Sequence, residues 1–318
     1  MSLLIYAESA EGKFKKVAFE LASYAKKVAE SLGTTVTAVT INAGDVSELA
    51  KYGVDKVLKV KNEALSGFSA KAYADVIKQA AQKEGAKVVV LSSTTDSIYL
   101  SSLVAVGLDA GFASNVVGLP VSTNPFQVKR TAFSNKAFTI TEITTDVKVL
   151  GLAKNSYGII ENNVSLTEED FNPTIDAADF NVKVTAVEKS SGKISIADAD
   201  IVVSGGRGLK GPENWGMIEE LASVLGAATA CSKPVSDLGW RPHGEHVGQT
   251  GKPVATNLYI AIGISGAIQH IAGINSSKVK VVINNDPEAP FFKVADYGIV
   301  GDAFDVLPKL IDAVKAAK

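Results

Sequence analysis

The sequence is poor in cysteine, in net charge and in long apolar segments. Cys231 is the only cysteine, which excludes an internal disulfide framework and is typical of a reducing compartment. The formal net charge is -2 with acids and bases mixed along the chain, so no basic domain points to nucleic acid as a partner. No segment has the ~18 uninterrupted apolar residues of a membrane span, and the apolar run near Met1 is too short for a signal peptide. We therefore expect a cytoplasmic protein that is not embedded in a membrane.

The length and composition suit a globular protein of two domains. The chain has 318 residues, of which 46% are hydrophobic and 21% charged. Acidic residues, Asn and Ser dominate residues 161–200, and the segment KSSGK at residues 189–193 predicts a surface link. We place the domain boundary between residues 198 and 199.

The first domain, residues 1–198, begins with four alternations of an apolar strand and a helix. Strands are predicted at residues 3–7, 35–41, 56–60 and 87–91, and helices at residues 17–32, 47–52, 68–83 and 98–107. This alternation predicts an α/β domain with a mostly parallel sheet and helices on both faces. Residues 115–158 are rich in Val, Thr, Phe and Lys, and predict antiparallel strands that complete the same domain.

The second domain, residues 199–318, is a further α/β unit whose predicted strands all end in glycine or small polar residues. In open α/β sheets, ligands bind beyond the carboxyl ends of the strands. The strand ends here are Ser204–Arg207, Ser232–Lys233, Ser265–Gly266, Asn284 and Gly301–Asp302. Their hydroxyls, amides, cations and carboxylate suit a dinucleotide with a diphosphate. Cations and backbone N–H groups would hold the phosphates, and the amide and carboxylate would hold ribose hydroxyls or an adenine edge.

The segment LYIAIGISGAIQHIAGI, residues 258–274, reads as a strand, a glycine turn and a helix. We expect Ile268, Ile271 and Ala272 on one face of the helix, with Gln269 and His270 on another. The first N–H groups of a helix lack internal partners and carry partial positive charge, so this turn is suited to an anion. The alternative is a tight turn whose glycines serve close packing alone.

Several motifs resemble the alpha subunit of electron transfer flavoprotein. They are SGGRGLK (204–210), VGQTGK (247–252), GISGAIQHIAG (263–273) and INNDPEAPFFKVADYGIVGD (283–302), in the order in which that family has them. The opening LLIYAESAEGKFKK (3–16) is also similar to the start of that subunit, so the resemblance covers the whole chain.

The resemblance implies that the second domain binds FAD. Thr250 would hydrogen-bond the N5 side of the flavin, residues 265–270 would wrap the diphosphate, the ribityl chain and the flavin O2 edge, and Asn284 and Asp302 would hold the adenosine part. The full set of implied contacts is Arg207, Ser232, Lys233, Val247, Gly248, Gln249, Thr250, Ser265, Gly266, Ala267, Ile268, Gln269, His270, Asn284, Asp302 and Ala303.

Three positions also have a different interpretation or depart from the family. Where the family commonly has Ser-Arg, this chain has Ser232-Lys233, so positive charge is kept but a planar group able to stack on the flavin is not. Asp302 is also a candidate cap for the last predicted helix. His243 and His246 flank Glu245 without a third ligand, and we interpret them as lying outside any metal site.

The function implied by the resemblance is that of an electron carrier without a substrate of its own. FAD would take electrons from dehydrogenases, such as the acyl-CoA dehydrogenases of fatty acid beta-oxidation, and pass them to a quinone-linked or other acceptor. The chain would act in a heterodimer with a beta subunit. The alternatives are the alpha subunit of an NADH-oxidising, electron-bifurcating flavoprotein, a nicotinamide-dependent dehydrogenase, and a non-redox nucleotide-binding protein. The run Gly205–Gly208 lacks the third spaced glycine of a nicotinamide-binding turn, which disfavours the dehydrogenase.

Overall fold

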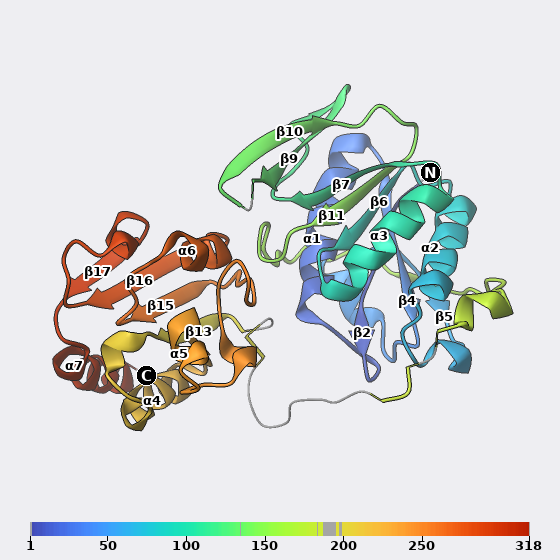
Figure 1. Cartoon of the computed structure of the whole chain (residues 1–318). Coiled ribbons are helices and arrows are strands. Elements are labelled where there is room, and N and C mark those ends of the chain that lie inside the picture. The colour runs from blue at the N-terminus through green and yellow to red at the C-terminus, as the bar shows by residue number, and fades with distance from the viewer. Residues whose placement is uncertain (1, 134, 183, 187–194, 197–198, 318) are drawn as a thin grey trace. The chain divides into compact units, whose positions relative to one another are not determined.

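The chain forms two α/β units in the computed structural model (Figure 1). The structure describes residues 2–133, 135–182, 184–186, 195–196 and 199–317. The first unit takes in residues 1–132 and 137–188, and the second takes in residues 133–136 and 189–318. The predicted link at residues 189–193, and residue 198 at the predicted domain boundary, lie outside the described residues, so that boundary stays a prediction.

The first unit is built on one long sheet in the order β10-β9-β7-β11-β6-β1-β4-β5-β12, with β8 paired to β9. A separate hairpin joins β2 (Ser9–Ala10) to β3 (Lys13–Phe14). The other strands are β1 (Ser2–Tyr6), β4 (Thr35–Ile41), β5 (Lys56–Val60), β6 (Val88–Ser92), β7 (Gly111–Val116), β8 (Ser122–Thr123), β9 (Phe126–Ala132), β10 (Ala137–Glu142), β11 (Lys148–Leu152) and β12 (Thr167–Asp170).

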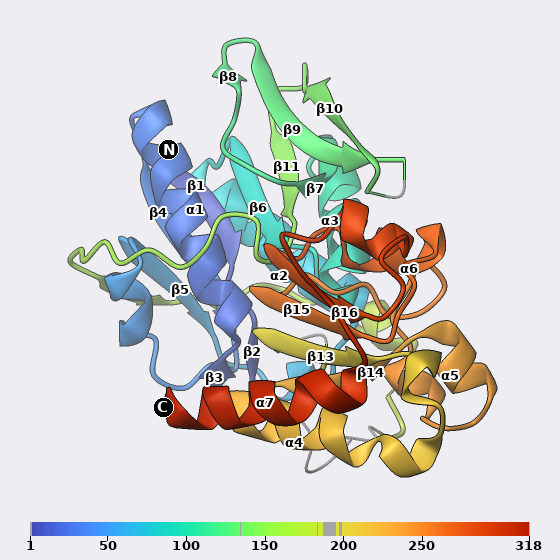
Figure 2. The same ribbon diagram turned by 90° about the vertical axis from the view of Figure 1, so that its left-hand side faces the viewer.

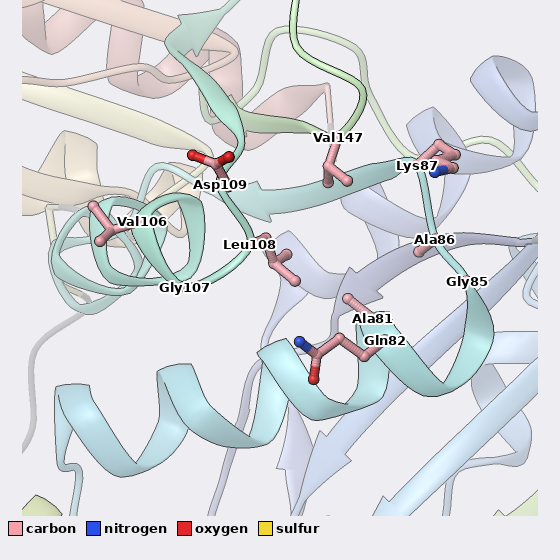
Figure 3. A pocket seen from close by; sticks show the side chains of 10 residues that line it. All are labelled: Ala81, Gln82, Gly85, Ala86, Lys87, Val106, Gly107, Leu108, Asp109 and Val147. Carbon is pink, nitrogen blue, oxygen red and sulfur yellow. The ribbon is translucent and has the colours of Figure 1, made fainter.

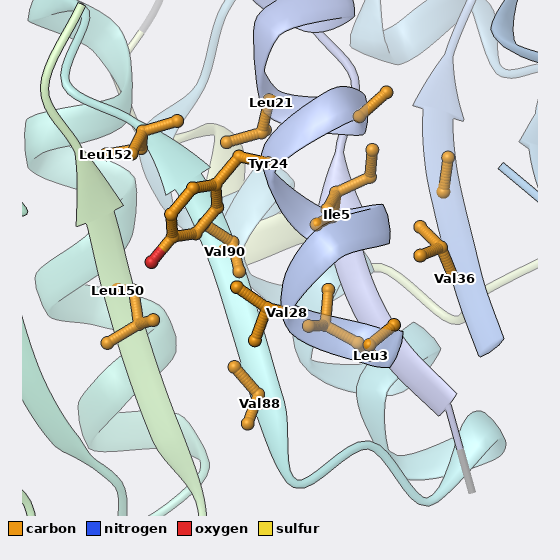
Figure 4. Close-up of a cluster of buried hydrophobic side chains, with 14 of the residues drawn as sticks. Leu3, Ile5, Leu21, Tyr24, Val28, Val36, Val88, Val90, Leu150 and Leu152 are labelled. Carbon is orange, nitrogen blue, oxygen red and sulfur yellow. The ribbon is translucent and has the colours of Figure 1, made fainter. Parts of the chain in front are cut away.

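The central strands are buried on both faces because each face carries helices. Helix α1 (Lys16–Leu32) packs on the side chains of Leu3 and Ile5, as the close-up of this core shows (Figure 4). Helices α2 (Ala70–Glu84) and α3 (Thr95–Gly107) pack on the opposite face, against Leu4 and Tyr6. Alternate residues of one apolar strand therefore serve two cores, as expected for a parallel sheet covered on both sides.

The structure confirms the α/β class and the parallel pairing of the predicted strands, and it corrects two details of the first unit. We expected antiparallel strands throughout residues 115–158, but β11 inserts parallel between β6 and β7. Within the described part of this segment, antiparallel pairing is confined to β9 and its neighbours β7, β8 and β10. Strand β12 was missed because its sequence TEED reads as an acidic loop. Its pairing with β5 is supported by ion pairs, Lys56–Glu169 at 2.8 Å and Lys59–Glu168 at 2.9 Å, rather than by apolar burial.

The second unit is a five-stranded parallel sheet in the order β14-β13-β15-β16-β17. Helices α4 and α7 cover one face, and α6 lies on the other, as two views at right angles agree (Figures 1 and 2). The strands are β13 (Ile201–Gly205), β14 (Ala228–Cys231), β15 (Leu258–Ile262), β16 (Val279–Asn284) and β17 (Tyr297–Val300). The helices are α4 (Gly216–Leu225), α5 (Lys233–Asp237), α6 (Ile268–Ile274) and α7 (Ala303–Ala316).

Each sheet has a topological switch point, where strands that follow in the sequence are added on opposite sides. The connections after the two strands at this point go to opposite faces of the sheet, and in α/β folds ligands bind between them at the carboxyl edge. In the first unit this point lies between β1 and β6, and it is filled by the buried side chain of Glu8. Its Oε1 atom accepts hydrogen bonds from the hydroxyls of Ser92, Thr94 (2.8 Å) and Ser97 (2.7 Å), and its Oε2 atom lies 3.2 Å from Lys15 Nζ. The chain's own carboxylate therefore satisfies the polar groups at this point.

Replacing Glu8 tests how strongly this internal anion supports the first unit. Glu8→Ala leaves three hydroxyls and a cation without their common partner, so we expect the free energy of unfolding to fall by about 3 kcal/mol. The measurement is calorimetric unfolding of the full chain. Glu161→Ala, at an exposed position, is the matched control and should change stability by less than about 0.5 kcal/mol. Equal losses in the two variants would contradict the role assigned to Glu8.

Candidate functional site

The topological switch point of the second sheet lies between β13 and β15, and two backbone turns meet there. A Cβ atom placed on Gly206 would lie 2.1 Å from the carbonyl oxygen of Gly263, so only glycine allows this approach. The Gly206 N–H donates to the Ile262 carbonyl at 2.8 Å, and the Gly208 N–H donates to the Gly263 carbonyl at 3.1 Å. The structure thus brings the SGGRG and GISG motifs, which are more than fifty residues apart in the sequence, into contact at the carboxyl edge of the sheet.

The predicted strand ends meet at this edge because all five strands run parallel. Exposed residues of the predicted set are Arg207, Lys233, Gln249, Thr250, Ser265, Ala267, Ile268 and Gln269. Buried residues of the set are Ser232, Val247, Gly248, Gly266, His270, Asn284 and Ala303, and Asp302 is half-buried. The edge therefore combines a buried floor with side chains that reach solvent.

The segment 247–250 is held against both β14 and α6. The Val247 N–H donates to the Cys231 carbonyl at 3.0 Å, and the Gln249 N–H donates to the Gln269 carbonyl at 2.7 Å. A Cβ atom on Gly273 would lie 2.5 Å from the Gly248 Cα, so this contact also needs glycine. The motifs VGQTGK and GISGAIQHIAG, separate in the sequence, are brought together here.

Helix α6 differs from the predicted faces at His270 and Ile268. His270 is buried, whereas Ile268 is 65% exposed, so the prediction that placed Ile268 and Ala272 on one face apart from His270 was wrong. The physical reason is Tyr259 of β15, whose hydroxyl lies 2.9 Å from His270 Nε2 within the core. A hydrogen bond between two buried side chains outweighs the apolar pattern of a helix that has only seven residues.

His270 is neutral near pH 7 in the chain as described. Burial is the main cause that lowers its pKa to about 4, and the neighbouring His246 lowers it further. The pKa of His246 is also lowered, chiefly by burial and then by His243 and Lys233. Burial raises the pKa of the Cys231 thiol to about 12, so this cysteine is a buried thiol and not a thiolate.

The side chains of Asn284 and Asp302 are already used within the chain. Asn284 donates from Nδ2 to the Ile264 carbonyl at 3.0 Å and accepts the Asp286 N–H at 3.0 Å. Asp302 caps α7 by accepting the Phe304 N–H at 3.0 Å, as predicted, and lies 3.3 Å from Lys210 Nζ. Each still has lone pairs to offer a ligand, but both first stabilise the turns that shape the edge.

Buried polar atoms without a hydrogen-bond partner of normal geometry gather on the α6 side of this sheet. Within the described part of the second unit they include Ser204 Oγ, His246 Nδ1 and His270 Nδ1. A Cβ atom on Gly248 would lie 3.4 Å from His246 Nε2 and 3.7 Å from His270 Cα, so Gly248 lies between the His246 ring and the backbone of α6. Because buried polar atoms are normally paired, these atoms fit a site that is completed by a polar ligand.

A hollow of the first unit lies elsewhere and has a different character. It has a volume of about 620 Å³ and lies between the end of α2, the start of β6 and the end of α3 (Figure 3). Its lining is mostly glycine, alanine, valine and leucine, with Gln82, Lys87 and Asp109 as the polar residues. It opens at the amino end of β6, away from the carboxyl edge at which α/β sheets bind ligands, so it is not the candidate site.

Sequence reasoning missed the residues beneath the edge. Tyr259, Phe291 and the cluster of Arg241 with Glu245 and Glu219 were not singled out, although Arg241 donates to Glu245 at 2.7 and 2.8 Å. Tyr259 and Phe291 stack with ring centroids 6.4 Å apart. An aromatic residue inside an apolar strand is ordinary in a sequence, and only its burial beside His270 gives it significance. Among the described residues, no helix is both long and apolar enough to cross a bilayer.

Comparison with known proteins gives two matching family models and many close relatives. A model described as the electron transfer flavoprotein domain matches residues 3–187, and one described as the electron transfer flavoprotein FAD-binding domain matches residues 195–275. The chain is 36% identical to electron transfer flavoprotein subunit alpha of Thermoanaerobacterium thermosaccharolyticum, over 99% of this chain and 98% of that one. It is 36% identical to the Syntrophomonas wolfei subunit alpha (98% and 98%) and 34% identical to the Bacillus subtilis subunit alpha (98% and 97%).

The depressed pKa of His270 makes the stability of the second unit depend on pH. Between pH 6.5 and about 4 the unfolded chain binds a proton that native His270 does not, so stability falls as pH decreases through this window. We expect a loss on the order of 3 kcal/mol from this residue. Trp215 and Trp240, the only tryptophans, both lie in the second unit, so their fluorescence during urea unfolding reports this unit alone.

The test compares the free energy of unfolding of the wild-type chain with that of His270→Gln. We expect the difference between the two to change with pH across that window. His243→Gln, which replaces an exposed histidine of the same unit, should keep the wild-type slope. If the free energy of unfolding of His270→Gln fell with decreasing pH as steeply as that of the wild type, other groups would be the cause of the acid sensitivity.

Proposed function

The chain belongs to the electron transfer flavoprotein alpha subunits, and we propose that it carries electrons from dehydrogenases to a quinone-linked or other acceptor. Its second unit is the FAD-binding domain of this family. Acyl-CoA dehydrogenases of fatty acid oxidation are the donors that we propose. The observation that supports FAD at this position is the close approach of the glycine turns that follow β13 and β15, together with buried polar atoms that lack hydrogen-bond partners of normal geometry.

We propose that different residues of this edge bind different parts of FAD, with the cationic side chain at the diphosphate and the neutral or acidic side chains at the flavin and the adenosine. Arg207, exposed on the turn after β13, supplies a guanidinium for the diphosphate, together with the N–H groups of Ser265 and Gly266. Thr250 and His270 contact the flavin. Asn284 and Asp302 hold the adenosine with the hydrogen-bonding capacity that their turns leave free. The bound FAD would supply the one- and two-electron redox chemistry, and these residues position it and shield it from water.

Alpha–beta heterodimer formation is the second part of the proposal. Helix α3 of the first unit exposes Ile98 (55%), Tyr99 (64%) and Val106 (84%), together with Leu103 (39%). An exposed apolar helix face of this kind is typical of a surface that another protein covers. We propose that a beta subunit covers it, which makes the chain alone incomplete as an electron carrier.

Gly206→Ala tests whether FAD binds at these glycine turns. The added Cβ would displace the turn at Gly263, so we expect most of the bound FAD to be lost from protein co-expressed with its beta subunit. The matched control is Gly216→Ala in α4, where an added Cβ meets nothing within 4 Å, and it should keep wild-type FAD content. The measurement is the flavin released by heating per mole of protein, with the released compound identified.

The outcome of that measurement also separates the alternatives. A colourless wild-type complex that cannot be reconstituted with FAD would refute the proposal. Release of a nicotinamide nucleotide would favour the dehydrogenase, and direct reduction of the flavin by NADH would favour the bifurcating subunit.

Lys233→Ala tests the cation that this chain has where the family commonly has arginine. Removing positive charge near the flavin should lower its reduction potential. Lys233 is largely exposed and lies 3.9 Å from Asp237, so solvent and the carboxylate offset its charge, and we expect a change of only roughly 10–20 mV. Redox titration measures it, with Lys278→Ala before β16, at the opposite edge of the sheet, as the control. An unchanged potential would remove Lys233 from the flavin site.

A further inference from the structure

Tyr259 is a fully buried residue with a hydroxyl group that must find a partner in the core. It is the second residue of β15, and its Oη atom is 2.9 Å from His270 Nε2. Burial raises its pKa, so the phenol stays protonated. A hydrogen bond between a phenol and a neutral imidazole runs in one of two directions, and the direction decides which ring nitrogen carries the proton.

Among the described residues the Tyr259 hydroxyl makes one hydrogen bond, with His270 Nε2, so a phenol that only accepted would leave its own buried hydrogen unpaired. The phenol is therefore the donor, and the effects of its neighbours agree. On one side, the Ser204 hydroxyl stabilises the charged form of Tyr259, as a donor to the phenol oxygen does, although it makes no hydrogen bond of normal geometry. On the other side, a backbone group of Val247 favours protonation of the His270 ring, as a carbonyl does. A ring that accepts at Nε2 and carries its proton on Nδ1 satisfies both neighbours, whereas the opposite tautomer would turn the Nδ1 lone pair towards that carbonyl.

The orientation of the imidazole is fixed as well as its proton. The centroid of the His270 ring lies 6.0 Å from that of Tyr259 and 6.1 Å from that of Phe291. The two aromatic rings are themselves nearly parallel, with an interplanar angle of 2°. The imidazole therefore packs against both rings, and the hydrogen bond to Tyr259 opposes exchange of its two nitrogens. His246 is the other titratable imidazole that acts on it.

We propose that Tyr259 is a positioning residue that holds His270 as the neutral tautomer with its proton on Nδ1. Nδ1 is buried, and its interaction with the Val247 backbone falls short of a hydrogen bond of normal geometry, so its N–H can still donate to a cofactor atom. This inference rests on the proposed function, in which His270 contacts the flavin. An N–H of fixed direction stabilises charge that develops on a carbonyl edge without introducing a cation, whereas the other tautomer would present a lone pair to it.

The tautomer is measured directly on the full chain without FAD. The chain has only three histidines, so long-range proton–nitrogen correlation spectra of a histidine-labelled sample contain three imidazoles, and His270→Gln identifies one. We expect wild-type His270 at neutral pH to show a protonated Nδ1 and an unprotonated Nε2. In Tyr259→Phe the loss of one hydrogen bond should reduce this preference about tenfold and give averaged nitrogen signals.

Tyr297→Phe is the matched control because Tyr297 is 67% exposed, and it should leave the His270 signals unchanged. A wild-type proton on Nε2, or unchanged signals in Tyr259→Phe, would overturn the inference. If Tyr259→Phe does not fold, the wild-type spectrum alone still decides which nitrogen is protonated.

A second measurement connects the tautomer to the flavin. In complexes with the beta subunit, Tyr259→Phe at wild-type FAD content should lower the flavin potential relative to Tyr297→Phe, and an equal potential would contradict the positioning role. Absence of FAD from a wild-type complex whose His270 has the expected tautomer would refute the proposed function and leave the tautomer intact. The two failures are therefore distinguishable.

Discussion

The backbone contact between Gly206 and Gly263 is the constraint on which the second unit depends. Two turns that follow neighbouring parallel strands approach so closely that a single added carbon atom would overlap a carbonyl oxygen. The approach is possible because the sheet reverses its strand order between β13 and β15, which directs the following connections to opposite faces. Beside these turns, residues 247–250 are held by hydrogen bonds to β14 and α6.

The two units differ in whether the buried polar groups near the switch point of the sheet have partners within the chain. In the first unit the switch point contains Glu8, and three hydroxyls and a lysine satisfy its carboxylate. In the second unit, Ser204, His246 and His270 lie on the α6 side of the sheet, each with a buried polar atom that lacks a good partner. Since burial of an unpaired polar group is costly, the first arrangement is complete by itself, and the second gains stability when a ligand supplies the missing bonds. One α/β architecture thus yields a structural unit and a cofactor-binding unit.

At the carboxyl edge of the second unit's sheet, the charged side chains are exposed and the buried imidazole is neutral. Arg207 and Lys233 reach solvent, whereas His270 is buried and its pKa is depressed to about 4, so it is uncharged at neutral pH. A buried cation at this position would need a partner that the described side chains do not provide, and neutrality avoids that penalty. Tyr259 and Phe291 then hold the imidazole in place through a hydrogen bond and ring contacts.

The sequence by itself determined the α/β class, the parallel strands and the glycine-rich turns that mark the cofactor edge, because these follow from local periodicity and from residues with special backbone freedom. Its motifs also identified the family and the FAD-binding domain, which the family models confirm. It did not determine that residues 148–152 run parallel, that TEED forms a strand, or that His270 faces the core while Ile268 faces solvent. Those features were decided by tertiary structure, because pairing partners distant in the chain and the burial of a polar pair leave no signal in local periodicity.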